Sequence, residues 1–295
     1  MTPNTYRFKF NFLFVAFLIV LALFLSCTKD IDVKIPDFEQ KLVVEGSIEP
    51  GQKPTVILTW TAPYFGEQNY SNIQQFFVNN AIVTVSDGSI SDTLIAFFPG
   101  IFPIYTAQNL TGVAGKTYSL KIEVNGKVYT SSTTIPAPVP LDSLYFSLEI
   151  GDSLGFIKSK FKEPAELGNN YRWFTQRVGK DQTFIPQFGS TTDDKFINGK
   201  EFEFIFSRGS APNSQAEEDQ NIERGYFKKG DSVLVKFCTI GPKEFRYFRS
   251  YYQNLSSNGN PFSAPATLES NIEGGGIGLW CGYGSYIKGI RLATP

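Results

Sequence analysis

The chain contains no histidine among its 295 residues. Histidine is the usual base of Ser-His-Asp and Cys-His catalytic sites, a frequent general base elsewhere, and a common zinc ligand. Its absence excludes histidine-based catalysis and most zinc sites. We predict no catalytic residue and no metal ligand, expect no cofactor, and expect that the protein is not an enzyme.

An excess of charge of either sign is also missing. The chain has 27 basic and 28 acidic residues, for a net charge of −1. Nucleic-acid binding needs a basic surface, so nucleic acid is not an expected partner. Methionine occurs once, whereas phenylalanine occurs 28 times and tyrosine 14 times. Together with abundant glycine and proline, this composition favours strands and turns over helices.

The longest apolar run lies near the start of the chain, from Phe12 to Leu25, and follows Arg7 and Lys9. Its 14 residues are fewer than the roughly 20 of a membrane-spanning helix, which is the alternative interpretation. A basic start, a short apolar centre and a small residue before a cleavage point are typical of a secretory signal peptide, here residues 1–26.

The end of that segment, Ser26-Cys27, resembles a bacterial lipobox, with Phe24 where leucine is usual. The resemblance implies that Cys27 carries lipid, such as palmitate, and becomes the first residue of the mature chain. Residues 27–37 would then form a lipid-anchored tether. Acidic residues beside Lys29 resemble the export signal of Bacteroidota surface lipoproteins, which implies an outer-membrane protein facing the outside of the cell. A solvated, charged tether is the alternative.

Residues 38–135 contain short alternating strands separated by turn residues, as in an antiparallel, Ig-like β-sandwich. The dipeptide Asn125-Gly126 is the strongest hairpin signal, because both residues tolerate positive φ. Residues 136–140 contain three prolines and cannot form a helix or a central strand. We interpret them as a linker between two domains; a proline-rich edge strand within one larger sandwich is the alternative.

Residues 141–295 are predicted to form a second β-rich domain with one packed helix near 242–256. Pro242 is tolerated in a first helical turn, and Phe245, Phe248, Tyr252 and Leu255 recur at helical spacing. We expect the helix to pack on a sheet; a surface helix that offers its aromatic face to a partner is the alternative. The expected fold class is mainly β, with two antiparallel β-sandwich-like domains.

Two groups of residues suggest ligand sites without matching one. The glycines from 274 to 278 are not followed by the helix of a phosphate loop, so a tight turn is the better interpretation. Asp193-Asp194 and Glu217-Glu218-Asp219 lack the alternating spacing of a calcium loop, which favours solvated loop charge.

Two cysteines remain besides Cys27, at Cys238 and Cys281. In an oxidising cell envelope such a pair often joins, so a disulfide between them is possible. Two buried free thiols are the alternative.

Six segments, in this order, resemble the domain-of-unknown-function family 4249 of Bacteroidota lipoproteins: 42–48, 63–66, 83–88, 193–200, 259–262 and 270–275. The resemblance covers nearly the whole mature chain and departs from the family at Cys281, where a small residue is more usual. Family members are often encoded beside TonB-dependent outer-membrane receptors. The resemblance therefore implies an accessory role at such a receptor, and it carries over no catalytic residue.

Two functions follow as hypotheses. The first is a non-enzymatic accessory or ligand-binding module of a TonB-dependent receptor system, attached to the membrane by its lipid. The second is a carboxylate-dependent hydrolase of extracellular polymers, which needs two acidic side chains across a pocket. A structural surface protein or adhesin is a further alternative.

Overall fold

The computed structural model describes residues 39–63, 72–210, 225–257 and 267–293. The chain divides into Met1–Glu39 and a compact unit, Gln40–Pro295. The expected signal peptide, Cys27 and the whole tether, residues 27–37, lie outside the described residues, as do Glu217-Glu218-Asp219. Within the described ranges, no helix has the length and apolar character needed to span a membrane.

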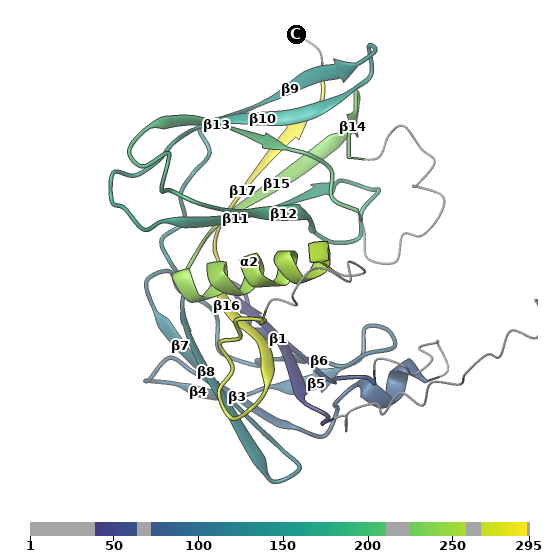
Figure 1. Cartoon of the computed structure of the whole chain (residues 1–295), viewed down its shortest axis with the longest axis vertical. Coiled ribbons are helices and arrows are strands. Elements are labelled where there is room, and N and C mark those ends of the chain that lie inside the picture. The colour runs from purple at the N-terminus through teal and green to yellow at the C-terminus, as the bar shows by residue number, and fades with distance from the viewer. Residues whose placement is uncertain (1–38, 64–71, 211–224, 258–266, 294–295) are drawn as a thin grey trace, which may run out of the picture. The chain divides into compact units, whose positions relative to one another are not determined.

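Two sheets form the first sandwich (Figure 1). One has the strand order β16-β1-β2-β6-β5 and the other β4-β3-β7-β8. The strands are β1 (Leu42–Ile48), β2 (Thr55–Trp60), β3 (Ile82–Ser86), β4 (Ser91–Thr93), β5 (Ile95–Phe97), β6 (Ile104–Thr106), β7 (Thr117–Val124), β8 (Lys127–Thr134) and β16 (Ile277–Gly282). A short 3₁₀ helix, η1 (Ile73–Phe76), lies between β2 and β3.

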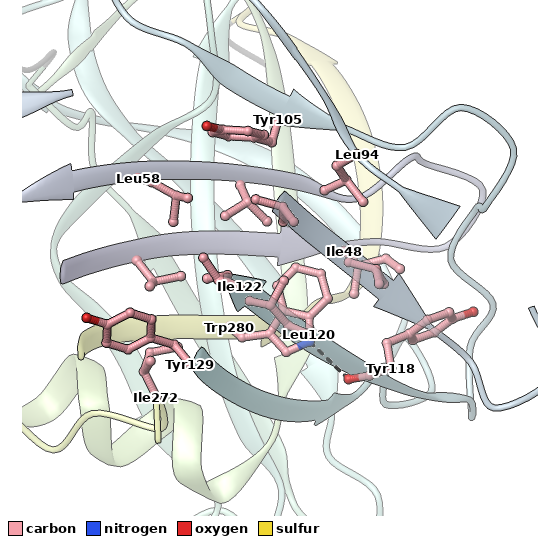
Figure 2. Packing of buried hydrophobic residues seen from close by; sticks show 14 of the residues in the cluster. Ile48, Leu58, Leu94, Tyr105, Tyr118, Leu120, Ile122, Tyr129, Ile272 and Trp280 are labelled. Atoms are coloured by element: carbon pink, nitrogen blue, oxygen red, sulfur yellow. Dashed lines mark hydrogen bonds between the residues drawn. The ribbon is translucent and has the colours of Figure 1, made fainter. Parts of the chain in front are cut away.

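The alternation of polar and apolar residues along the sequence explains why these segments form strands with one buried face. In β7, exposed and buried positions alternate along most of its length, so one face enters the core and the other meets solvent. The β7–β8 hairpin turns at Asn125 and Gly126, both at positive φ, as predicted. The inward faces of both sheets form one apolar core around Trp280, shown in Figure 2.

The strand β16 joins this sandwich although it comes late in the chain. It pairs in parallel with β1, with Val43 opposite Ile277 and Ile48 opposite Gly282. The sandwich expected from residues 38–135 therefore also contains residues 277–282. Residues 136–140 form neither strand nor helix, and their backbone approaches β17 so closely that a Cβ on Gly284 would lie 2.3 Å from the Pro136 carbonyl oxygen.

The second half contains two further four-stranded sheets. In one, β10 lies between β13 and β14 and also pairs with β9; the other has the order β12-β11-β15-β17. The strands are β9 (Ser143–Ile150), β10 (Leu154–Lys162), β11 (Asn170–Arg177), β12 (Ile185–Asp193), β13 (Glu201–Phe206), β14 (Phe227–Lys228), β15 (Ser232–Ile240) and β17 (Gly284–Arg291). An aromatic core that includes Phe161, Tyr171 and Phe237 lies between them.

The helix α2 (Pro242–Ser257) is present where the sequence predicted it. It contacts β11, β12 and β16, and its buried residues are Glu244, Phe248 and Ser250. Glu244 accepts a hydrogen bond of 2.6 Å from Thr133 Oγ1, and the same hydroxyl accepts one from the Gly282 N–H group. The predicted fold class, mainly β with antiparallel sheets and one packed helix, is confirmed.

Candidate functional site

The carboxylates that the sequence singled out hold loops together. Asp194 is buried, and its Oδ2 accepts hydrogen bonds from the N–H groups of Gly168 and Asn169 at 2.7 and 2.8 Å. Its neighbour Asp193 accepts from Lys195 N at 3.3 Å. The segment 193–200 therefore folds as a turn that fastens the preceding loop. The prediction that Asp193-Asp194 carries solvated loop charge is wrong for Asp194. Its carboxylate is buried because it accepts hydrogen bonds from backbone N–H groups.

A second buried carboxylate, Glu163, fastens the same loops from the other side. Its Oε1 accepts from Tyr171 Oη and Asn169 Nδ2, each at 2.9 Å, and its Oε2 accepts from Gly199 N at 2.7 Å. Burial, and then the hydrogen bond to Glu163, raise the pKa of Tyr171 far above its usual range. The Tyr171 hydroxyl therefore keeps its proton and donates it to Glu163 in a hydrogen bond. This bond stabilises the fold of the surrounding loops.

The described residues contain no group of three or more His, Cys, Asp or Glu side chains placed to hold a metal ion. The glycine-rich segment does not form a ligand loop either. Gly274 and Gly278 have φ of 87° and 123°, and a Cβ on Gly278 would lie 2.0 Å from the Val44 carbonyl oxygen. Gly278 lets β16 approach β1, and a Cβ on Gly274 would lie 2.4 Å from the Val128 carbonyl oxygen of β8, so these glycines serve a turn and close backbone packing.

Cys238 and Cys281 are both fully buried in one cluster with Phe174, Ile240 and Phe248. Both are free thiols in the structure. Burial raises the pKa of each thiol, so neither is a reactive thiolate near neutral pH. The disulfide between them stays a prediction.

A buried cation that the sequence analysis missed lies beside this cluster. Arg172, on β11, is 6% exposed, and its Cζ lies 3.6 Å from the ring centroid of Phe248 and 5.0 Å from that of Phe174. Its Nη1 donates to Tyr252 Oη at 3.2 Å, whereas its buried Nε has no hydrogen-bond partner. Within the described part of the chain, no carboxylate pairs with this guanidinium.

A neighbouring cation, Lys236 on β15, is paired. Its Nζ binds Glu49 Oε1 at 2.8 Å and lies 4.7 Å from the ring centroid of Phe174. Glu49 follows β1, so this mostly buried ion pair joins the two halves of the chain. Arg172 differs from Lys236 in that, among the described residues, aromatic rings stabilise its charge and no carboxylate pairs with it.

A row of aromatic side chains leads from Arg172 to the surface, and we call Tyr247, Phe248, Tyr251, Tyr252 and Phe188 the aromatic ladder. Ring centroids along it lie 5.1 to 6.2 Å apart. Four of its rings come from α2 and Phe188 comes from β12; Phe188 is 63% exposed and Tyr251 is 41% exposed. Burial, and then the nearby Glu45 carboxylate, raise the pKa of Tyr247 to about 12.

The sequence carried a signal for this site. The strand 170–178 has Tyr171, Trp173 and Thr175 on one face, so Arg172 and Phe174 share the other. Pairing with β15 sets Arg172 opposite Cys238 and Phe174 opposite Lys236. A buried arginine is unusual, and here it lies on the face of β11 that α2 covers.

Comparison with known proteins identifies the family of this chain. No curated protein matches it. Among solved structures, a two fibronectin type-III domain segment from chicken tenascin is similar at 14% identity, over 69% of this chain and 92% of that chain, with a TM-score of 0.20. A family model, the domain of unknown function DUF4249, matches residues 28–286. Because this match spans most of the chain, the protein belongs to the DUF4249 family, as the six resembling segments predicted.

Proposed function

We propose that this protein is an outer-membrane lipoprotein, held by lipid on Cys27, that serves as a non-enzymatic binding module beside a TonB-dependent receptor. The signal peptide and lipobox-like Ser26-Cys27 support the anchor. The receptor is proposed on the resemblance to lipoproteins encoded beside such receptors.

The observation that carries the binding role is the aromatic ladder. Binding energy at protein interfaces is concentrated in tyrosine, tryptophan and arginine, and large exposed aromatic rings anchor partners. Phe188 and Tyr251 expose such rings side by side with Tyr252, which the buried Arg172 contacts. The guanidinium is stacked on Phe248, so the exposed rings have a rigid base. Rigid aromatic side chains lose little conformational entropy on binding.

The surroundings of the buried carboxylates support binding over hydrolysis. A carboxylate-dependent hydrolase needs an acid and a base facing a substrate across an open cleft. Glu163 and Asp194 are both almost fully buried and accept hydrogen bonds from the loops around them. Removing those bonds would unfasten the loops.

The test is co-purification of the tagged, full-length chain from detergent-solubilised membranes of a cell that encodes it beside such a receptor. We expect a TonB-dependent receptor in near-stoichiometric amount. The double variant Phe188→Ser/Tyr251→Ser should lose at least about tenfold of it, because two interface aromatics each contribute about 1 kcal/mol or more. The matched control is Ile287→Ser on β17, an exposed apolar residue on the opposite edge strand of the same sheet.

Equal recovery from both variants would contradict the role of the aromatic ladder. Absence of any receptor from the wild-type sample would contradict the receptor assignment. The variant Cys27→Ser tests the anchor separately, since it should leave the membrane fraction and appear in soluble form.

A further inference from the structure

An uncharged segment of the first sandwich carries a second exposed apolar surface. No charged residue occurs between Asp92 and Lys116. Residues 97–102, which we call the apolar loop, comprise the last residue of β5 and most of its connection to β6, and Phe98 and Ile101 are 59% and 51% exposed. Several large apolar side chains exposed together mark a contact with another protein or with a membrane.

A series of contacts connects the apolar loop to the residues where the described chain begins. The Lys41 carbonyl oxygen accepts a hydrogen bond from Thr61 N at 2.9 Å, and Lys41 N donates to Thr61 Oγ1 at 3.0 Å. Thr59 forms a β-bridge with Phe77, whose ring centroid lies 5.7 Å from that of Phe102. These contacts place Phe102 and Lys41 at the same end of the sandwich. Figure 1 shows η1 and the β5–β6 hairpin together at this end of the sandwich.

We propose that the apolar loop inserts into the outer surface of the lipid bilayer that anchors Cys27. This inference rests on the proposed lipid anchor. Lys41 lies 14 residues after Cys27, a length that reaches about 50 Å at full extension. The tether therefore enters the sandwich at the end that holds Lys41 and the apolar loop, and it keeps that end within reach of the membrane. An apolar loop that enters the bilayer adds membrane affinity to that of the acyl chains on Cys27.

The chemistry of the loop favours lipid over a protein partner. Its side chains are those of Phe97, Phe98, Pro99, Ile101 and Phe102, and none of them donates or accepts a hydrogen bond. Such a surface gives apolar contact without specific recognition. Pro99 also lacks a backbone N–H group, so one fewer donor loses its water when the loop enters lipid.

The test uses the full-length lipidated protein in vesicles of phosphatidylethanolamine and phosphatidylglycerol with brominated acyl chains, which quench tryptophan fluorescence on contact. The variant Phe98→Trp places a reporter in the loop. The matched variant Ile90→Trp places one at a residue that is 56% exposed, in the turn after β3, at the far end of that strand from Phe77. We expect about a twofold loss of the added emission for Phe98→Trp and none for Ile90→Trp.

Mass analysis first establishes that Cys27 carries lipid. Equal quenching of the two reporters, or quenching of neither, would then overturn the insertion of the apolar loop. Protection of the Phe98→Trp reporter by a co-purified receptor would assign the loop to a protein interface and would also overturn it. These outcomes leave the lipid anchor and the receptor proposal standing.

A second measurement does not depend on the lipid. In the Cys27→Ser background, the mature chain from residue 27 onward should still bind the same vesicles weakly. Phe98→Ser/Ile101→Ser should reduce that binding at least about tenfold, because two large apolar side chains no longer leave water. Unchanged binding would count against the apolar loop, whereas a loss restricted to the loop variant supports it.

Discussion

Gly46 lies directly beneath the indole ring of Trp280: a Cβ on Gly46 would lie 2.7 Å from the indole Cε3 atom. The ring is fully buried, and its Nε1 donates a 3.0 Å hydrogen bond to the Tyr118 carbonyl oxygen across the sandwich. Asn271 holds the backbone of Trp280 through two further hydrogen bonds, at 2.8 and 2.9 Å. This contact fixes β16 against β1, although the two strands lie at opposite ends of the sequence.

We therefore expect Trp280→Ala to destabilise the fold by about 3–5 kcal/mol, because it leaves a cavity and an unpaired carbonyl group. Gly46→Val should also be strongly destabilising, since its side chain meets the indole. The measurement is urea unfolding at neutral pH. The control is Gly100→Ala, because no atom of the described residues lies within 4 Å of the position that its Cβ would take. This variant should change the stability by no more than about 0.5 kcal/mol. A Trp280→Ala protein as stable as wild type would contradict this role.

Asp92 predicts a dependence of stability on pH. Burial raises its pKa, but hydrogen bonds from the N–H groups of Gln108, Asn109 and Leu110 outweigh burial and lower it below the ordinary 3.8. A carboxylate with a lowered pKa in the folded state stabilises the protein above its unfolded pKa. That contribution is lost as the pH falls through the lower, folded value.

We expect Asp92→Asn to cost about 1–3 kcal/mol at pH 7, with a difference from wild type that shrinks below about pH 4. Urea unfolding from pH 7 to pH 3 measures it. The exposed Asp152→Asn is the control and should show no such pH-dependent difference. A difference that stays constant across this range would argue against the hydrogen bonds as the cause.

Glu163 predicts local loosening of the loops it joins. Glu163→Ala removes the acceptor of three hydrogen bonds and leaves Tyr171 Oη and the Gly199 N–H group without that partner. We expect a loss of about 2–4 kcal/mol, with faster amide exchange in residues 163–170 and 194–200. Glu201→Ala, at an exposed position nearby in sequence, should leave the exchange of both loops unchanged. Exchange that is equally slow in both variants would contradict the prediction.

The stacking of Arg172 on Phe248 predicts that lysine cannot replace arginine at position 172 without a loss of stability. Arg172→Lys keeps the positive charge but loses the planar stack on Phe248, so we expect a loss of about 1–2 kcal/mol. Receptor recovery should fall as well if Arg172 supports the aromatic ladder. Arg249→Lys, on the exposed face of α2, is the matched control and should change neither quantity. Equal stability and equal receptor recovery for the two variants would contradict a role of Arg172 in the proposed site.

The two buried cysteines predict slow alkylation. Because burial raises the pKa of both thiols, we expect Cys238 and Cys281 to resist iodoacetamide at pH 7.5 in the folded protein. In denaturant without reductant, the addition of two alkyl groups to Cys238 and Cys281 would show free thiols. The addition of no alkyl group to them would show a disulfide. Rapid labelling of the folded protein would contradict the burial of both residues.

Short-range patterns in the sequence were enough to predict the class of this fold. Alternation at period two, Asn125-Gly126 in a hairpin, and Pro242 followed by apolar residues at helical spacing all act between near neighbours in the chain. Strand β7, the β7–β8 turn and helix α2 therefore follow from residues that lie close together in sequence.

The tertiary structure alone decided which distant segments meet. Parallel pairing of β1 with β16 joins Val43 to Ile277, and no local pattern specifies a partner so far along the chain. Local patterns also do not specify that Asp194 is buried and accepts a hydrogen bond from the Gly168 N–H group. Nor do they specify that Arg172 stacks on Phe248 where α2 packs against β11. Packing and hydrogen bonding between remote residues set these outcomes, because they depend on volume and donor geometry that exist once the chain has folded.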